Sequence, residues 1–157
     1  MKKSQDYKSI KVENMAYLPY NKNGNWKVIT ISSGNLEDDP IIKFLHSLEP
    51  KLKRKVFHSL ELLETYGYDL RFPYSRYLES GIFELRVSLG NNLVRILYFF
   101  DKNKIIILSN AFIKKTQKTP RKEINKAKEN RNQYMENKYG IHIKTNSWSR
   151  IRIRFRI

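Results

Sequence analysis

Three apolar stretches rich in β-branched and aromatic residues follow one another in the middle of the chain, at residues 82–87, 93–100 and 104–108. Short runs of this kind, bounded by turn residues, are typical of strands. The connection at residues 90–92, Gly-Asn-Asn, is a strong hairpin signal, and residues 101–103 form a second turn. The pattern therefore predicts an antiparallel meander of three strands.

Two stretches before the meander have apolar residues at helical spacing. Each begins with an acidic residue followed by proline, at Asp39-Pro40 and at Glu49-Pro50. An acidic cap with proline at the first helical position is a common helix start. Gly67 offers a C-terminal cap for the second helix. We therefore predict an αα-hairpin ahead of the meander.

One strand and one helix complete the predicted domain. Residues 26–31 alternate as in a first strand, and Thr119-Pro120 repeats the cap-plus-proline start for a helix that extends to about residue 137. The fold class is α+β, a small antiparallel or mixed sheet with an N-terminal αα-hairpin and a C-terminal helix. The expected organisation is an N-terminal extension over 1–25, one domain over 26–137 and a basic tail over 138–157.

Composition and charge narrow the range of possible functions. The 157 residues fit one domain, and 31 Lys and Arg against 15 Asp and Glu give a formal net charge of +16. Such an excess indicates a polyanionic partner, with nucleic acid first. The chain has no cysteine and three scattered histidines, so we expect no metal and no cofactor. We also expect a cytoplasmic protein, because no leader-like apolar segment follows the start and no apolar run has membrane-spanning length.

Basic residues on the strands are the first candidates for chemistry. Arg86 lies on the first meander strand, and Arg95 shares a strand face with Leu97 and Phe99. A charge on such a face is either capped by a carboxylate such as Glu84 or left open for an anion. Guanidinium groups match phosphate oxygens, which makes phosphate the expected ligand.

Further cations flank these strands. Lys114 and Lys115 follow the last strand. The candidate RNA-binding residues outside the sheet are Lys51, Lys53, Arg54, Lys118 and Arg121. Each group is either a solvated helix surface or binds phosphate.

The segments 83–86, 94–100 and 112–120, the last of which is Phe-Ile-Lys-Lys-Thr-Gln-Lys-Thr-Pro, together resemble the signature of RelE/ParE-superfamily toxins, most closely the phage-derived, HigB-like branch. The resemblance covers roughly residues 26–137. It implies a compact type II toxin, a ribosome-dependent mRNA endonuclease that needs no metal and that stops translation and growth. It also implies a cognate helix-turn-helix antitoxin.

The resemblance also assigns residues to roles. Arg95 matches the family's central sheet arginine, Arg86 matches the basic position on the preceding strand, and Lys114 or Lys115 falls where the family has a further cation. No histidine lies near the sheet, so the candidates for the general base are Tyr98 and a lysine with a depressed pKa.

Two other functions remain open. A ParE-like protein with a similar fold would inhibit DNA gyrase without cleaving anything. A non-catalytic RNA-binding module would use the alternating Arg/Ile tail at 150–157 and a tyrosine-rich stretch that contains Tyr66, Tyr68, Tyr74 and Tyr77. Turn and core packing is the alternative role for those tyrosines.

Overall fold

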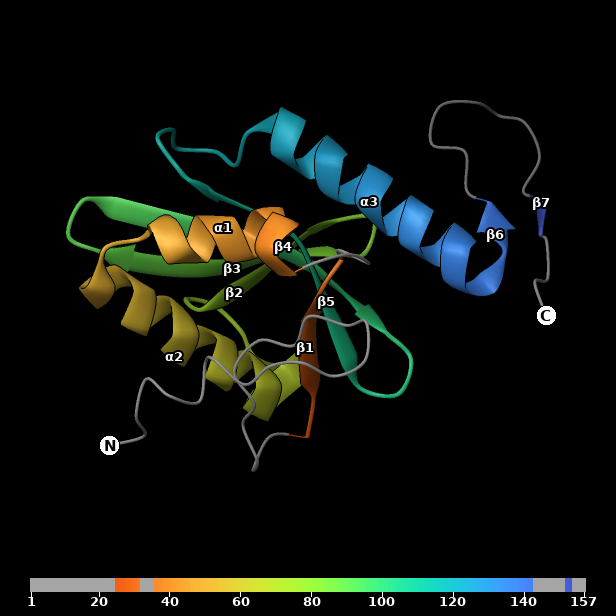
Figure 1. Ribbon diagram of the computed structural model, residues 1–157, viewed down its shortest axis with the longest axis horizontal. Helices are drawn as coiled ribbons and strands as arrows, with labels where there is room; N and C mark the ends of the chain where they lie inside the picture. The colour runs from red at the N-terminus through yellow and green to blue at the C-terminus, as the bar shows by residue number, and fades with distance from the viewer. Residues whose placement is uncertain (1–24, 32–35, 143–151, 154–157) are drawn as a thin grey trace.

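A computed structural model describes residues 25–31, 36–142 and 152–153. Its main element is a five-stranded sheet in the order β1-β5-β4-β3-β2 (Figure 1). β1 is parallel to β5, and the other neighbours are antiparallel. The strands are β1 (Lys27–Thr30), β2 (Ser75–Glu79), β3 (Ile82–Leu89), β4 (Asn92–Asp101) and β5 (Ile105–Ile113), and the helices are η2 (Leu36–Asp38), α1 (Pro40–Ser47), α2 (Pro50–Tyr66), η3 (Gly67–Asp69) and α3 (Arg121–Tyr139).

This architecture confirms the predicted α+β fold, with its mixed sheet, αα-hairpin and C-terminal helix. One strand is additional. No strand was predicted at the residues of β2, yet they pair with β3 and extend the meander to four antiparallel strands. Two of the first three β2 residues, Arg76 and Tyr77, are exposed, so this edge strand lacks the apolar pattern that marks its neighbours.

The starts of α1 and α2 confirm the predicted caps. The Asp39 carboxylate accepts hydrogen bonds from the backbone N–H groups of Ile41, at 2.8 Å, and Ile42, at 3.2 Å. The Glu49 carboxylate accepts one from the Leu52 N–H, at 3.0 Å. These bonds satisfy N–H groups that have no partner within the helix, which fixes where both helices begin.

The end of α2 depends on glycine. Gly67 has φ +51°, and a Cβ placed there would lie 2.1 Å from the indole ring of Trp26. Trp26 in turn packs edge-on against Tyr68, with ring centres 4.9 Å apart. The glycine therefore allows both the backbone turn and the close approach of the first strand.

The start of α3 differs from the prediction. Pro120 occupies the N-cap position and makes no side-chain capping bond. Thr119 was predicted to cap the helix, but its hydroxyl donates instead to the Glu84 carboxylate. The helix extends two residues beyond the predicted end, to Tyr139, and stops at Gly140, which has φ +67°.

The helices cover both faces of the sheet (Figure 1). On one face, α1 and α2 bury a large core around Leu60, Leu85 and Ile96. On the other, α3 buries a smaller core in which Ile124 and Ala127 contact the sheet side chains. The apolar contact of α3 is thin, as its sequence predicted, so polar contacts have more weight in holding it.

Asp101, at the end of β4, makes three of these polar contacts with α3. Its carboxylate accepts hydrogen bonds of 2.6 Å from Tyr134, Lys138 and Tyr139 of α3. Burial acts to raise the pKa of Asp101, but these hydrogen bonds outweigh it and hold that pKa below its usual value. Burial and the Asp101 partner raise the pKa of Tyr134 to about 12. The C-terminal half of α3 is thus fastened to the sheet through one carboxylate.

The ends of the chain are described only in part. The predicted N-terminal extension falls almost wholly outside the described residues, and so does most of the predicted tail. Within the tail, β6 (Ile141–His142) pairs antiparallel with β7 (Arg152–Ile153). Among the helices that the structure describes, none combines the length and the apolar character that a membrane crossing requires.

Candidate functional site

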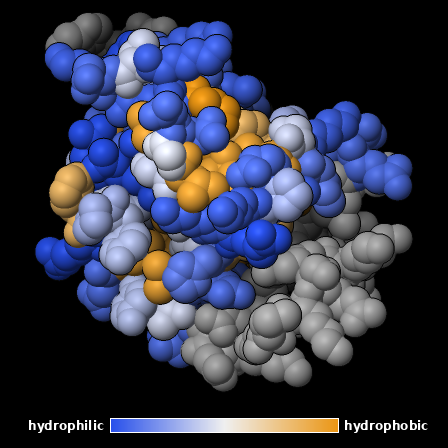
Figure 2. Space-filling model, turned by 90° about the vertical axis from the view of Figure 1, so that its left-hand side faces the viewer, coloured by the Kyte–Doolittle hydropathy of each residue, from blue (hydrophilic) through white to orange (hydrophobic). Residues whose placement is uncertain are grey.

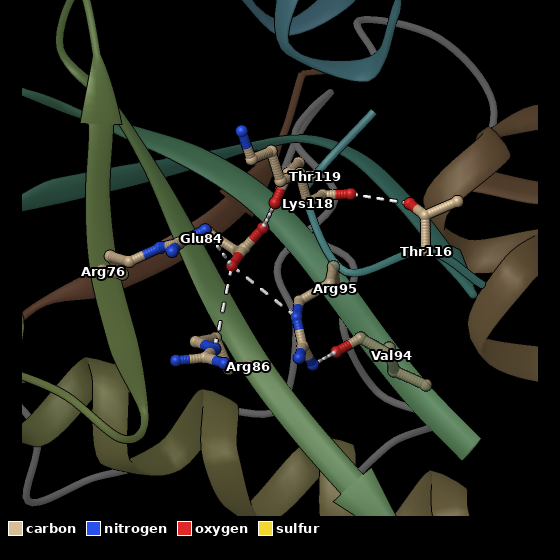
Figure 3. A network of polar contacts seen from close by, with 8 residues as sticks. All are labelled: Arg76, Glu84, Arg86, Val94, Arg95, Thr116, Lys118 and Thr119. Atoms are coloured by element: carbon tan, nitrogen blue, oxygen red, sulfur yellow. Dashed lines mark hydrogen bonds and ion pairs between the residues drawn. The ribbon is translucent and has the colours of Figure 1, made fainter. Parts of the chain in front are cut away.

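The Glu84 carboxylate is the centre of a cationic cluster, which we define as Arg76, Arg86, Arg95 and Lys114 around Glu84. Figure 3 shows Glu84 with the three arginines. Oε1 of Glu84 lies 3.4 Å from Nη2 of Arg76, 3.8 Å from Nε of Arg86 and 3.6 Å from Nε of Arg95. Its other oxygen accepts the Thr119 hydroxyl bond. The carboxylate itself is fully buried.

Strand register brings these side chains together. Arg76 of β2 is directly paired with Glu84 of β3, and Arg86 of β3 is directly paired with Arg95 of β4. Directly opposed residues have their side chains on the same face of a sheet. Alternation along β3 places Glu84 and Arg86 on that same face, which is the face that α3 partly covers.

The three guanidinium groups differ in access to solvent. The side chain of Arg76 is 45% exposed, that of Arg86 is 22% exposed and that of Arg95 is only 4% exposed. The Arg95 guanidinium group is held in place by a hydrogen bond of 2.9 Å, which its Nη1 donates to the Val94 carbonyl. Arg76 and Arg86 are therefore the groups presented at the surface, and Arg95 adds charge beneath them.

The pairing with Glu84 leaves donors unused. Among the residues that the structure describes, the buried Nε atoms of Arg86 and Arg95 have no hydrogen-bond acceptor. Burial lowers the pKa of Arg95, and Arg86 and Arg76 lower it further, whereas Glu84 raises it. Arginine remains charged under these conditions. The sequence left two alternatives for Arg95, a carboxylate cap or an open site for an anion. Arg95 contacts the Glu84 carboxylate, and its Nε still has no acceptor among the described residues, so it has features of both.

Lys114 completes the cluster, immediately after β5. Its backbone N–H donates a 2.7 Å hydrogen bond to the Leu93 carbonyl, and the residue is buried. Burial lowers the pKa of the Lys114 ammonium group, Arg95, Arg76 and Arg86 lower it further, and only Glu84 opposes them. Lys115 is exposed. Of the two candidate lysines, the structure places Lys114 with the arginines.

The connection between β5 and α3 covers one side of the cluster. Thr119 anchors it to Glu84, and the Thr116 hydroxyl donates a 2.7 Å bond to the Lys118 carbonyl. Lys118 is exposed there (Figure 3). Arg121, at the start of α3, pairs with Glu79 of β2, with 3.0 Å between its Nη2 and Oε2. Lys118 is thus open to a ligand beside the cluster, whereas Arg121 is engaged in an ion pair.

The charge of the cluster is unbalanced. One carboxylate faces three guanidinium groups, so the cluster has two more positive than negative charges before Lys114 is counted. Partly buried like charges raise the local potential and attract an anion. The arrangement can bind a phosphate diester and stabilise negative charge that develops on it.

Tyr98 does not belong to the cationic cluster. Its ring is buried in the core beneath α1 and α2, on the face of the sheet opposite Arg86 and Arg95. Its hydroxyl is hydrogen-bonded to that of Ser75, and burial raises the pKa of Tyr98 to about 12. A phenol with this pKa and no access to solvent is unsuited to accept a proton from a substrate. The structure thus argues against Tyr98 as the general base.

The basic residues of α2 form a separate surface. Lys51 and Arg54 are exposed, and Lys53 donates a 3.2 Å hydrogen bond to the His46 carbonyl. Because α2 packs on the opposite face of the sheet, these three residues are not brought together with the cationic cluster.

The sequence reasoning missed Arg76 and placed Glu84 only as a possible cap for an arginine. The register of β2 against β3 would have revealed Arg76, but β2 itself was not predicted.

The end of the molecule that carries the β3–β4 hairpin has a mixed surface. Figure 2 views this end and shows a hydrophobic area surrounded by hydrophilic residues. Leu89, Leu93 and Ile113 all lie at this end of the sheet and are at least partly exposed. Apolar side chains at this end of the sheet are therefore presented to solvent among polar ones.

No curated protein matches this chain. The family model described as phage-derived protein Gp49-like (DUF891) matches residues 43–132, a segment that begins within α1, ends within α3 and contains every member of the cationic cluster. The chain therefore belongs to the family of phage-derived Gp49-like proteins, which is a toxin-like family.

Proposed function

We propose that this protein is the toxin of a type II toxin–antitoxin pair and cleaves mRNA on the ribosome, as in the HigB-like branch of the RelE/ParE superfamily. The observation that supports this most is the cationic cluster, in which a buried lysine with a lowered pKa lies among three arginines that share one carboxylate. Membership of a toxin-like family is consistent with the proposal.

The reaction needs no group beyond RNA and protein side chains. The 2′-hydroxyl attacks the adjacent phosphorus, a P–O bond to the 2′-oxygen forms, and the bond to the 5′-oxygen breaks. A base takes the proton of the 2′-hydroxyl, and an acid protonates the departing 5′-oxygen. In this proposal Arg76 and Arg86 hold the phosphate at the surface, and Arg95 stabilises the charge of the phosphorane from beneath.

Lys114 is the proposed proton-transfer residue. A lysine with its ordinary pKa is almost fully protonated at neutral pH and accepts protons poorly. Burial beside three arginines favours the neutral amine of Lys114. A pKa closer to neutrality improves the group both as base and, once protonated, as acid. Lys115 lacks this environment because it is exposed.

The proposal implies partners. A helix-turn-helix antitoxin would keep the toxin inactive in the cytoplasm, and the ribosome would present single-stranded mRNA to the cluster. The formal charge of +16 favours approach to ribosomal RNA.

The test is induction of the chain in a bacterial host, with mapping of mRNA 5′ ends on translated and untranslated copies of one transcript. The wild type should cut only the translated copy. Lys114→Met should lose about 100- to 10,000-fold in cutting, the range typical of a lost general acid or base. Lys115→Met and the matched control Lys126→Met, at an exposed position of α3, should cut like the wild type.

Each alternative function predicts a different result. Growth arrest with DNA damage and continued translation would support gyrase inhibition. Arrest with intact mRNA and intact DNA would indicate binding without cleavage. Undiminished cutting by a folded Lys114→Met variant would remove Lys114 from the mechanism, and loss of cutting in Lys115→Met alone would transfer the role to Lys115.

A further inference from the structure

The four residues 71–74, Arg-Phe-Pro-Tyr, form an exposed loop beside the cationic cluster. Backbone hydrogen bonds hold the loop in place. The N–H groups of Tyr74 and Ser75 donate to the Arg71 carbonyl, at 3.0 and 3.1 Å, and the Arg86 N–H donates to the Tyr74 carbonyl, at 2.8 Å. The last of these bonds ties the loop to the same residue of β3 whose side chain belongs to the cluster.

Phe72 is the most exposed large hydrophobic residue of the loop, at 71%. Its ring faces the guanidinium group of Arg86, with 4.9 Å between Cζ and the ring centre. Two other exposed aromatic residues pack against partners in the sheet. Tyr68 lies against Phe100, with ring centres 3.8 Å apart, and Tyr77 lies against Phe83, at 5.2 Å. Phe72 thus presents an aromatic surface to solvent next to a phosphate-binding group.

Arg86 belongs to two arrangements at once. Through Glu84 it is part of the cationic cluster, with 3.8 Å between its Nε and Oε1 of Glu84. Through its planar guanidinium group it holds the Phe72 ring. A phosphate at Arg86 would therefore have an aromatic ring within the dimensions of a single nucleotide.

We propose that Phe72 and Arg86 form a stacking site for one base of single-stranded RNA, next to the phosphate that the cluster binds. The inference rests on the proposed function, and it adds a base-recognition element to a site otherwise made of charges. Stacking on an aromatic ring accepts any base, because every base has a π-face. The site would orient the nucleotide beside the scissile phosphate without selecting a sequence.

The experiment measures binding of a short oligonucleotide of 2′-O-methyl RNA, which cannot be cleaved, to the full chain by fluorescence anisotropy. A second probe of equal length has abasic residues throughout and keeps only the phosphates. Phe72→Leu removes the ring but keeps an apolar side chain, and Phe72→Tyr keeps the ring. Tyr66→Ala, at an exposed tyrosine of α2, is the matched control.

Phe72→Leu should weaken binding of the base-containing probe by about 5- to 150-fold, the range for one stacked base, and leave the abasic probe unchanged. Phe72→Tyr and Tyr66→Ala should bind both probes like the wild type. Equal binding of the base-containing probe by Phe72→Leu and the wild type would overturn the stacking site alone. Failure of the wild type to bind either probe would overturn the RNA-binding function as well.

Discussion

The substitution Glu84→Gln tests whether one buried carboxylate organises the cationic cluster. It keeps the shape of the side chain and removes its charge. At an effective dielectric constant of about 20, unit charges about 3.6 Å apart attract by roughly 4 to 5 kcal/mol. Desolvation of Glu84 and repulsion among the arginines offset much of this, and solvent screens the exposed Arg76. Breaking a buried pair commonly costs about 3 to 5 kcal/mol, so we expect the lower end, about 3 kcal/mol.

The assay is thermal unfolding of the wild type, Glu84→Gln and the control Glu129→Gln, whose carboxylate is exposed on α3. A loss of about 3 kcal/mol corresponds to a fall in Tm of about 6 to 12 °C. Sulfate should restore more of the Tm in Glu84→Gln than in the control, because a bound dianion takes the place of the missing carboxylate. Unfolding of Glu84→Gln at the wild-type temperature, or an equal gain from sulfate in both variants, would refute the reasoning.

Two further predictions concern the scaffold. Asp101→Asn should cost about 2 to 3 kcal/mol at neutral pH, because three charge-assisted or phenolic hydrogen bonds to α3 weaken. Since the pKa of Asp101 is lowered by folding, the wild-type advantage should be complete above the ordinary carboxyl pKa of 3.8 and shrink as the pH falls below it. Thermal unfolding of both proteins from pH 7 to pH 2 checks this, and an advantage that grows in acid would contradict it. Gly67→Ala should cost about 2 to 4 kcal/mol, because a Cβ would lie 2.1 Å from the Trp26 ring at a φ of +51°; urea unfolding measures the loss, and a neutral result would contradict the close packing.

Local signals predicted those parts of the fold whose causes are local. The Asp39-Pro40 pair sets the start of α1 through bonds to N–H groups two and three residues away. Thr119-Pro120 has the same form, yet Thr119 contacts Glu84, 35 residues away in the chain. A capping rule cannot foresee that a buried carboxylate elsewhere competes for the hydroxyl.

The site was predictable to the extent that strand alternation determined it. Counting by two placed Arg86 with Glu84, and the same counting separates Tyr98 from Arg95, because they lie three residues apart on one strand. The same counting, applied to Tyr98, would have removed this residue from the candidates for the general base. Arg76 had no such signal, since its place depends on β2 pairing with β3. The choice between Lys114 and Lys115 depends on which way the chain turns as it leaves β5.

The parallel pairing of β1 with β5 has a consequence for how the chain folds during synthesis. Val28 is paired with Ile106, so contacts that span nearly half of the chain close the sheet. Such high contact order delays the step until both segments are present. β1 is made before β5 and, among the described residues, has no strand partner until β5 follows it, and Lys114 and Thr119 come later still. A nascent chain that stops before residue 114 would therefore have the three arginines and Glu84 but would lack Lys114 of the cationic cluster.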